Sequence, residues 1–354
     1  MNILFLVSRN YHEQKMSRCR FHQMEAVGRS AGVHLTVWGA GFPEYRDRET
    51  LAANIQRTFG PTAFDLIHVY RPDDHLDVAG CPIPKSIDYN EAWDRKAVAR
   101  EILQHDIRLV IFHHANDLQA FLGHGRLTRD RHLAHIPHGA ERAIFAPAAQ
   151  PWEERSIPAL LTGALRPDVY PLRARCADLI RGGRLPGEIR AHPGYRTTGD
   201  AATRDQFVDY AQHLGRSRLA LVLGITYNYA LAKYPEAAMA GCLLVGDVPD
   251  ELVPTLGQHM VRLQPEMSDA QIVQTVTWWL EHDTVARERA AASQQLAFTR
   301  YTMEHYADRF VRVVQEFLTA EAQRHHQPVG PRRLRARSQA VAAWLAHTFR
   351  LSPR

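Results

Sequence analysis

Short runs of apolar residues recur along this chain, with helical stretches between them. They cover residues 3–7, 34–39, 65–70, 108–114 and 132–138 in the first half, and 158–163, 187–192, 218–224, 242–247 and 260–263 in the second. Within each run the hydrophobicity is continuous rather than alternating, which is typical of parallel strands covered on both faces by crossover helices. The alternation of strand and helix therefore predicts an α/β protein.

The chain is long enough for two domains, and it divides near residues 145–158. At 354 residues it exceeds the usual size of one domain. The stretch FAPAAQPWEERSIP holds three prolines and a charge cluster but no apolar period, so we interpret it as a linker. We predict Rossmann-like domains at residues 1–148 and 158–302 with a linker at 149–157, then an amphipathic helix at 303–322 and a basic tail at 323–354.

Composition excludes several classes of protein. The four cysteines are scattered and form no CxxC pair, which argues against a disulfide scaffold or a zinc site. No apolar run approaches the length of a membrane span, and residues 3–7 are too short for a signal peptide. The glycines at 39 and 41 lack the third glycine and the helix of a dinucleotide site. We expect a cytoplasmic protein without a dinucleotide cofactor.

The positive charge is concentrated at the end of the chain. Residues 325–354 hold six arginines and neither acids nor lysine, while the net charge of the whole chain is only +5. A nearly neutral body is not typical of a nucleic-acid-binding domain, so we expect no nucleic-acid partner. Apolar residues beside the arginines allow two interpretations: a peripheral contact with the inner, anionic face of a membrane, or a solvated tail.

The segment KYPEAAMAGCLLVGD, residues 233–247, places a charged pair where a ligand is expected. Paired α/β domains bind ligands outside the carboxyl ends of their strands. Lys233 and Glu236 follow the strand at 218–224, and Pro235 suits the first position of a helix. The free N–H groups of such a turn favour a phosphate. A solvated pair on the surface of a helix is the alternative.

Histidines at the end of a predicted strand form a second candidate. His113 and His114 end the apolar run at 108–114, at the edge where ligands bind, although a buried histidine is often only a hydrogen-bonded core residue. Three further histidines occur at positions 132, 135 and 138. On an extended strand they would point to opposite faces, so we predict no metal site.

Arg166 and a segment of the first domain complete the candidates. Arg166 follows the first strand of the second domain, where a guanidinium group suits a diphosphate, or it is a surface residue. In the first domain, the segment SIDYNEAWD (86–94) precedes a helix. We predict that Tyr89, Asn90 and Glu91 of this segment, together with Arg20, contact an acceptor; a plain helix cap is the alternative.

Together these motifs resemble the group 1 glycosyltransferases of the GT-B fold, retaining branch, and most closely their spore-maturation-protein-like subgroup. The similar segments are 17–45, HIPHG…FAP at 135–147, LLTGALRPDVYPLR at 160–173, KYPEAAMAGCLLVGDVPDE at 233–251, and the helix that ends YADRFVRVVQEFL. The resemblance covers nearly the whole chain. It implies two Rossmann-like domains facing a central cleft, with a C-terminal helix that crosses back to the first domain.

The resemblance also implies roles for individual residues. Glu236 matches the family's glutamate that holds the ribose of the nucleotide. Arg166 and Lys233 match its basic pair on the diphosphate. His114, or its neighbour His113, falls where the family has a histidine near the reacting sugar, and we favour His114.

The chain departs from the family pattern in the loop before Glu236. The family's first glutamate falls on Asn228, and its glycine-rich loop is replaced by YALAKY, residues 229–234. Asn228, Tyr227 and Tyr229 are therefore expected near the donor, but the identity of the transferred sugar stays open.

The function that the resemblance implies is transfer of a sugar from a nucleotide-sugar, a UDP- or GDP-sugar, to a hydroxyl acceptor. The acceptor would be a glycan or lipid-linked saccharide of polysaccharide biosynthesis. In retaining members the leaving phosphate deprotonates the acceptor, so neither a carboxylate base, a cofactor nor a metal ion is implied. The alternatives are a nucleotide-sugar epimerase or phosphorylase of the same fold, and a non-catalytic GT-B domain that binds a glycan or a partner.

Overall fold

The structure is a computed structural model that describes residues 1–15, 18–190, 199–224 and 227–326. The chain divides into two compact units, Met1–Val314 and Gln315–Arg354. Both sheets lie in the first unit, so this division does not test the domain boundaries predicted from the sequence. Of the predicted basic tail, residues 327–354 lie outside the described part of the chain.

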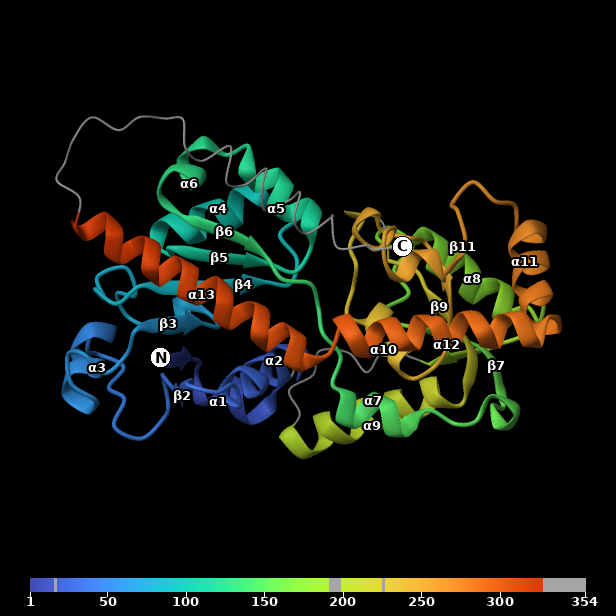
Figure 1. Cartoon of the computed structure of the whole chain (residues 1–354), viewed down its shortest axis with the longest axis horizontal. Coiled ribbons are helices and arrows are strands. Elements are labelled where there is room, and N and C mark those ends of the chain that lie inside the picture. Colours follow the sequence, from blue (N-terminus) through green and yellow to red (C-terminus); the bar gives the residue numbers. More distant parts are fainter. Residues whose placement is uncertain (16–17, 191–198, 225–226, 327–354) are drawn as a thin grey trace. The chain divides into compact units, whose positions relative to one another are not determined.

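The first sheet has six parallel strands in the order β2-β1-β3-β4-β5-β6 (Figure 1). They are β1 (Asn2–Leu6), β2 (His34–Trp38), β3 (Leu66–Val69), β4 (Lys85–Tyr89), β5 (Leu109–Phe112) and β6 (His132–His135). We call this sheet and the helices between its strands the first half, and the second sheet with its helices the second half. The helices of the first half are α1 (Arg9–Gln14), α2 (Arg18–Gly28), α3 (Leu51–Thr58), α4 (Arg95–Gln104), α5 (Ala115–Leu122) and α6 (Gly125–Asp130).

Strand β4 was not predicted, because its sequence KSIDY is not an apolar run. Its polar side chains are nevertheless buried, and each has a partner. Lys85 donates from Nζ to the carbonyl oxygen of Cys81 at 2.7 Å, and Asp88 pairs with Arg20. Burial of polar groups is tolerated when they are hydrogen-bonded. The sequence of the strand alone does not show that these groups have partners.

The second sheet has five parallel strands in the order β11-β10-β9-β7-β8. They are β7 (Ile157–Thr162), β8 (Glu188–Arg190), β9 (Ser217–Val222), β10 (Leu243–Gly246) and β11 (Val261–Arg262). The accompanying helices are α7 (Arg142–Ala148), α8 (Pro171–Arg181), α9 (Asp200–Gly215), α10 (Lys233–Met239), α11 (Asp269–Glu281) and α12 (Asp283–Arg300). Helix α7 ends at Ala148, directly before the linker predicted at residues 149–157.

Both faces of the second sheet are covered, as the continuous apolar runs predicted. In β9, Leu219 and Leu221 belong to a core cluster shared with α8 and α11. The intervening residues, Ala220 and Val222, belong to a second cluster shared with α7, α9 and α10. Successive side chains of a strand point to opposite faces, so a strand in this position must be apolar throughout.

The C-terminal helices connect the two sheets. Helix α12 packs against α10 and β10 of the second half. Helix α13 (Met303–His326) then returns to the first sheet, where Tyr306 lies 5.8 Å from the ring of His113 and Phe310 lies 5.2 Å from that of His68. The predicted crossing of a C-terminal helix back to the first half is thus confirmed.

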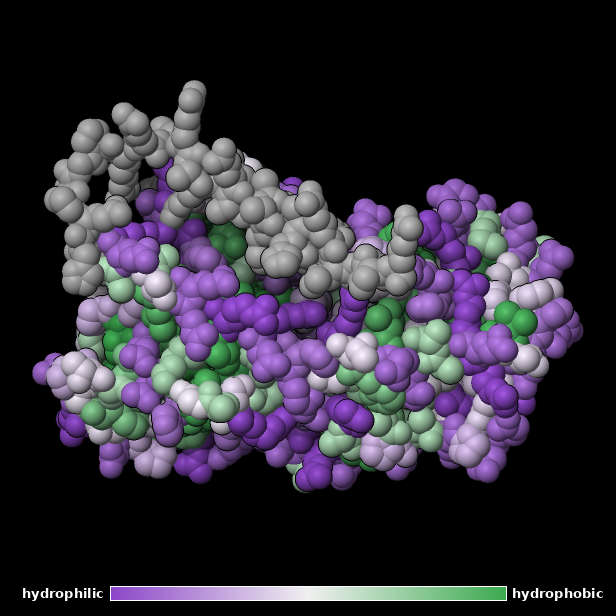
Figure 2. Space-filling view, viewed as in Figure 1, coloured by the Kyte–Doolittle hydropathy of each residue, from purple (hydrophilic) through white to green (hydrophobic). Residues whose placement is uncertain are grey.

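No helix among the described residues is both long and apolar enough to cross a lipid bilayer. On the face shown in Figure 2, hydrophilic and hydrophobic residues are interspersed.

We predict that Gly215→Ala destabilises the second half. Gly215 ends α9 where this helix meets α7, and a Cβ added there would lie 1.7 Å from the carbonyl oxygen of Ala148. Relieving such an overlap costs about 1–3 kcal/mol. Calorimetry should show a Tm several degrees below that of the wild type. Gly125→Ala is the control, because nothing lies within 4 Å of its added Cβ; equal melting of the two variants would contradict this account of the α7–α9 contact.

Candidate active site

Two cationic side chains lie at the carboxyl end of β7. Lys233, the first residue of α10, donates from Nζ to the carbonyl oxygen of Thr162 at 3.2 Å. Arg173 of α8 is buried and donates from Nε to the carbonyl oxygen of Leu223 at 2.7 Å. A Cβ on Gly163 would lie 2.7 Å from Lys233 Nζ and 2.9 Å from an Arg173 nitrogen, so both cations border the backbone of this glycine. Only glycine readily takes its φ of 103°.

Glu236 lies on the same helix as Lys233 and is almost fully buried. Its carboxylate accepts a hydrogen bond from the hydroxyl of Tyr210 at 3.2 Å. Burial raises the pKa of Glu236 to about 7. Burial and then the neighbouring Arg173 lower the pKa of Lys233 to about 7. An anionic ligand between Lys233 and Arg173 would relieve their repulsion and favour the charged lysine.

The structure corrects two details of the sequence analysis here. Pro235 is the third residue of α10 rather than the first, and the backbone N–H of Glu236 already bonds to the carbonyl oxygen of Ala232. The N–H of Glu236 is therefore not free for a phosphate. Arg166 is exposed and pairs with Asp168 at 2.5 Å, so the structure brings Arg173, not Arg166, next to Lys233.

His113 belongs to a buried network around the carboxylate of Asp88. Arg20 Nη2 lies 2.5 Å from Asp88 Oδ1, His113 Nε2 lies 3.0 Å from Oδ2, and His68 Nε2 lies 3.3 Å from Oδ1. Burial alone would raise the pKa of Asp88, but Arg20 and the two histidines hold it well below its usual range. His113 also bonds to the carbonyl oxygen of Ile136 at 2.9 Å, so both its ring nitrogens are occupied.

His114 lies in a different environment from its neighbour. It is fully buried, and neither of its ring nitrogens makes a hydrogen bond within the described part of the chain. The ring of Tyr229 stacks on it at 4.0 Å with an interplanar angle of 10°. The Tyr229 hydroxyl donates to Asp117 Oδ1 at 2.9 Å. His114, the favoured candidate near the reacting sugar, is thus covered by Tyr229.

Glu251, which the sequence analysis did not select, connects the two halves of the first unit. Its carboxylate accepts backbone hydrogen bonds from Ala115 at 3.2 Å and Ala230 at 3.3 Å, and lies 3.0 Å from His135 Nε2. Burial alone would raise the pKa of Glu251, but the nearby rings of His114 and His135 lower it to about 2. Its only signal in the sequence was its place at the end of the motif 233–251.

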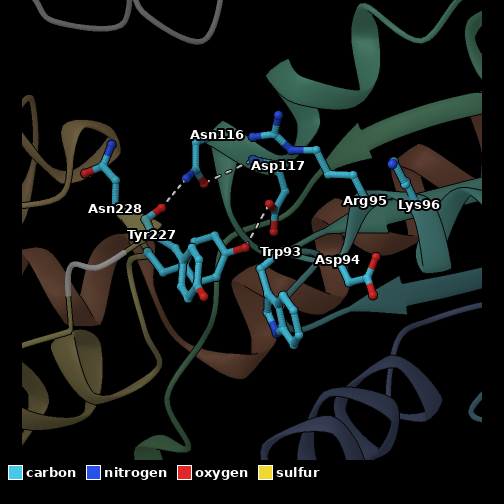
Figure 3. A pocket seen from close by; sticks show the side chains of 9 residues that line it. Trp93, Asp94, Arg95, Lys96, Asn116, Asp117, Tyr227 and Asn228 are labelled. Carbon is cyan, nitrogen blue, oxygen red and sulfur yellow. Dashed lines mark hydrogen bonds between the residues drawn. The ribbon is translucent and has the colours of Figure 1, made fainter. Parts of the chain in front are cut away.

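Two cavities lie at the carboxyl ends of the first sheet. The first, of about 680 Å³, is lined by Trp93, Asp94, Arg95, Lys96, Asn116, Asp117, Tyr227, Asn228 and Tyr229 (Figure 3). The second, of about 360 Å³, is lined by Arg20, Tyr70, Arg71, Pro72, Asp73, Ile87, Asp88, Tyr89, Asn90, Glu91, Trp93 and Glu101. All four predicted acceptor residues line the second cavity. Three of the predicted donor residues, Tyr227, Asn228 and Tyr229, line the first cavity. Lys233 and Glu236 do not line it.

Asn228 fixes the conformation of the loop before α10 through its own backbone and side chain. It has a left-handed conformation with φ of 56°, which asparagine tolerates better than most residues. Its Nδ2 donates to Asp250 Oδ2 at 2.9 Å, and the Asp250 backbone N–H donates back at 3.1 Å. Asn116 Nδ2 donates to the carbonyl oxygen of Tyr227, one residue earlier.

Within the described residues there is no cluster of three or more histidine, cysteine or acidic side chains that could hold a metal ion. β6 ends at His135, so His138 does not share the strand on which the three histidines were placed.

No family model and no curated protein matches the chain by sequence. Solved structures resemble it in fold. Sucrose-phosphate synthase from Thermosynechococcus elongatus has a TM-score of 0.57 at 14% identity, covering 90% of this chain and 100% of that one. Anabaena Alr3699/HepE in complex with UDP-glucose has 0.58 at 12% identity, covering 91% and 100%. An alpha-glucosyltransferase in complex with UDP and a 13-mer DNA has 0.62 at 7% identity, covering 89% and 99%. The chain therefore has the two-sheet, Rossmann-like GT-B fold.

We predict that Asp88→Asn lowers the free energy of unfolding by about 3 kcal/mol, because it leaves the partly buried Arg20 without its counter-charge. The wild type should also lose stability on acidification. The pKa of Asp88 is lower in the folded state than its unfolded value of about 3.9, so the ionised group stabilises the fold above that pH. This stabilisation is lost progressively as the pH falls from about 3.9 towards the folded pKa. Denaturant titrations between neutral pH and about pH 3 should show a shallower acid dependence for the variant.

Asp168→Asn is the matched control, because Asp168 is paired with an arginine but exposed. It should leave the unfolding curve unchanged. An Asp88→Asn protein as stable as the wild type would contradict the central role of this carboxylate.

Proposed function

We propose that this chain is a retaining glycosyltransferase that transfers a sugar from a nucleotide-sugar, UDP- or GDP-linked, to a hydroxyl acceptor. The observation that carries the proposal is the pair of cations, Lys233 and Arg173, at Gly163, with the buried Glu236 on the same helix as Lys233. They lie at the carboxyl end of a doubly wound parallel sheet, where such folds bind nucleotides. Arg173 takes the place that the sequence analysis gave to Arg166.

The chemistry asks the protein mainly to stabilise a leaving diphosphate. The guanidinium group of Arg173 and the ammonium group of Lys233 can offset the negative charge that grows on the diphosphate as its bond to the sugar breaks. A carboxylate such as Glu236 can accept hydrogen bonds from the two ribose hydroxyls. The structures of Anabaena HepE with UDP-glucose and of the alpha-glucosyltransferase with UDP, which share the fold, support a nucleotide-sugar donor.

We further propose that the reaction needs neither a metal ion nor a cofactor and that the leaving phosphate deprotonates the acceptor. The resemblance to the spore-maturation-protein-like subgroup supports this. His114 is the residue that we assign to the reacting sugar, and Tyr229 stacks on it. Movement of Tyr229 would admit the donor, and its return would exclude water from the reaction.

For the acceptor we propose a glycan or lipid-linked saccharide of polysaccharide biosynthesis, at the cytoplasmic face of a membrane. The second cavity, with Arg20, Tyr89, Asn90 and Glu91 in its lining, is the part of the first half that supports this proposal. Contact of the tail with the membrane involves residues 327–354 and remains a prediction from the sequence.

The test is the melting temperature of the purified chain with UDP, GDP, dTDP, CMP, ADP or NAD, each with and without Glu236→Ala. A ligand at a hundred times its Kd stabilises the folded state by about 2.7 kcal/mol. We expect one nucleoside diphosphate to raise the Tm by several degrees and Glu236→Ala to abolish the increase. Glu153→Ala is the control, because Glu153 is an exposed glutamate that pairs with Arg287.

The absence of a shift with every nucleotide would overturn the donor site. It would favour the non-catalytic binding domain, which the replacement of a glutamate by Asn228 already suggests. Turnover of the nucleotide-sugar without an acceptor would favour the epimerase instead.

We also predict that nucleoside diphosphate binding weakens as the pH rises above about 7. Lys233 has a lowered pKa, so it loses its proton and its positive charge in this range unless the ligand is bound. The dissociation constant should then rise by up to about tenfold per pH unit. Isothermal titration calorimetry between about pH 7.5 and 9, above the titration of the phosphate itself, measures this effect. In Lys233→Met the affinity should be weak and this slope should be lost; the same slope in this variant would exclude Lys233 as its source.

A further inference from the structure

Two exposed aromatic rings stand side by side at the first cavity. Trp93 precedes α4 of the first half, and Tyr227 lies in the loop before α10 of the second half. Trp93 is 58% exposed and Tyr227 is 42% exposed, and both line the cavity. Their ring centroids lie 6.3 Å apart with an interplanar angle of 21° (Figure 3). Neighbouring aromatic side chains left exposed at a cavity are typical of a ligand-binding surface.

The spacing of the two rings determines how a ligand can use them. A ring inserted between them would need a separation of about 7 Å, twice the contact distance of carbon atoms. At 6.3 Å there is no room for it. A ligand must therefore pack on an outer face of the pair, where each ring offers an apolar surface with partial negative charge. The C–H face of a pyranose ring has the complementary shape and polarity.

The polar groups of the cavity define the rest of the ligand. Asp94 caps α4 by accepting from the backbone of Ala97 at 3.0 Å, and Asp117 accepts from Tyr229. Arg95 and Lys96, in contrast, are exposed and make no hydrogen bond or ion pair within the described residues. Burial raises the pKa of the Asp117 carboxyl group, but Arg95 is also close enough to lower it in part. The acids of the cavity thus accept hydrogen bonds from the protein, whereas its two cations donate none within the described residues. A ligand that binds here should bring anionic oxygen atoms.

We propose that the first cavity binds an acidic saccharide as the acceptor, with a pyranose ring on Trp93 and Tyr227 and a carboxylate or phosphate substituent on Arg95 and Lys96. This rests on the proposed function, since it names the acceptor of that transferase. The cavity volume of about 680 Å³ is in the range that encloses a small ligand. Tyr229 lines the same cavity and stacks on His114, so the bound sugar would lie next to the residue assigned to the reaction.

Trp93 also lines the second cavity. A saccharide of more than one unit can therefore continue past Trp93 towards Arg20, Asn90 and Glu91. A nucleobase would stack on the same rings, but the cations that suit a donor diphosphate are Lys233 and Arg173 in the second half. We therefore assign the aromatic pair to the acceptor and treat nucleobase binding as an outcome of the test.

The experiment measures binding of four probes to the full chain by calorimetry: trigalacturonate, glucose 6-phosphate, maltotriose and UMP. The first two probes separate a carboxylate from a phosphate as the anionic group. We expect one of them to bind about tenfold more tightly than maltotriose. Trp93→Ala should weaken this binding about tenfold or more, and Arg95→Ala/Lys96→Ala should remove the preference for the acidic probe.

Trp278→Ala is the matched control, because Trp278 is a similarly exposed tryptophan, at 43%, on α11. It should bind the probes like the wild type. Circular dichroism of each variant confirms that it is folded, as expected for changes at exposed residues.

Three results would overturn the proposal: no saccharide binds, Trp93→Ala binds as the wild type does, or only UMP binds in a Trp93-dependent way. If UDP or GDP raises the Tm through Glu236 but no saccharide binds, the acidic acceptor is wrong and the transferase stands. If an acidic saccharide binds through Trp93 but no nucleotide raises the Tm, the cavity is a saccharide site and the transferase is wrong.

Discussion

The carboxylate of Asp88 is the interaction on which the arrangement of the first half depends. It lies on β4, near the carboxyl edge of the sheet, and contacts Arg20 of α2, His68 of β3 and His113, which directly follows β5. The two histidines in turn contact Phe310 and Tyr306, so the returning helix α13 packs on rings that this carboxylate orients. A buried charge with fewer partners would be too costly, so this network fixes α2, β3, β4, β5 and α13 relative to one another.

A second set of contacts joins the two sheets at the candidate active site. Glu251 bonds to backbone groups of Ala115 and Ala230, and Tyr229 reaches Asp117 across the same boundary. These contacts cover His114 and leave Lys233 and Arg173 at the edge of the second sheet. In the transferase that we propose, the donor would bind to one half and the acceptor to the other, and the reacting groups would meet only where the halves touch.

Much of the fold followed from the sequence, because a strand covered on both faces must be apolar throughout and the apolar runs show this directly. β9 and β10 are examples: alternate residues enter different core clusters. β4 did not follow, because Lys85 and Asp88 interrupt its apolar pattern and their partners lie outside the strand: Cys81 in the preceding loop and Arg20 on α2. Local pattern predicts burial, but it does not predict which polar residue will find a partner.

For the site, the sequence by itself selected Lys233, Glu236 and His114, since each follows or ends a strand at the edge where ligands bind. It determined which residues come to that edge. Only the tertiary structure decided that Arg173, rather than Arg166, stands beside Lys233, and that Trp93 and Tyr227 share one cavity. The reason is physical: the end of a strand is fixed by local hydrogen bonding, whereas the neighbours of a side chain depend on how crossover helices and loops from distant parts of the chain pack together.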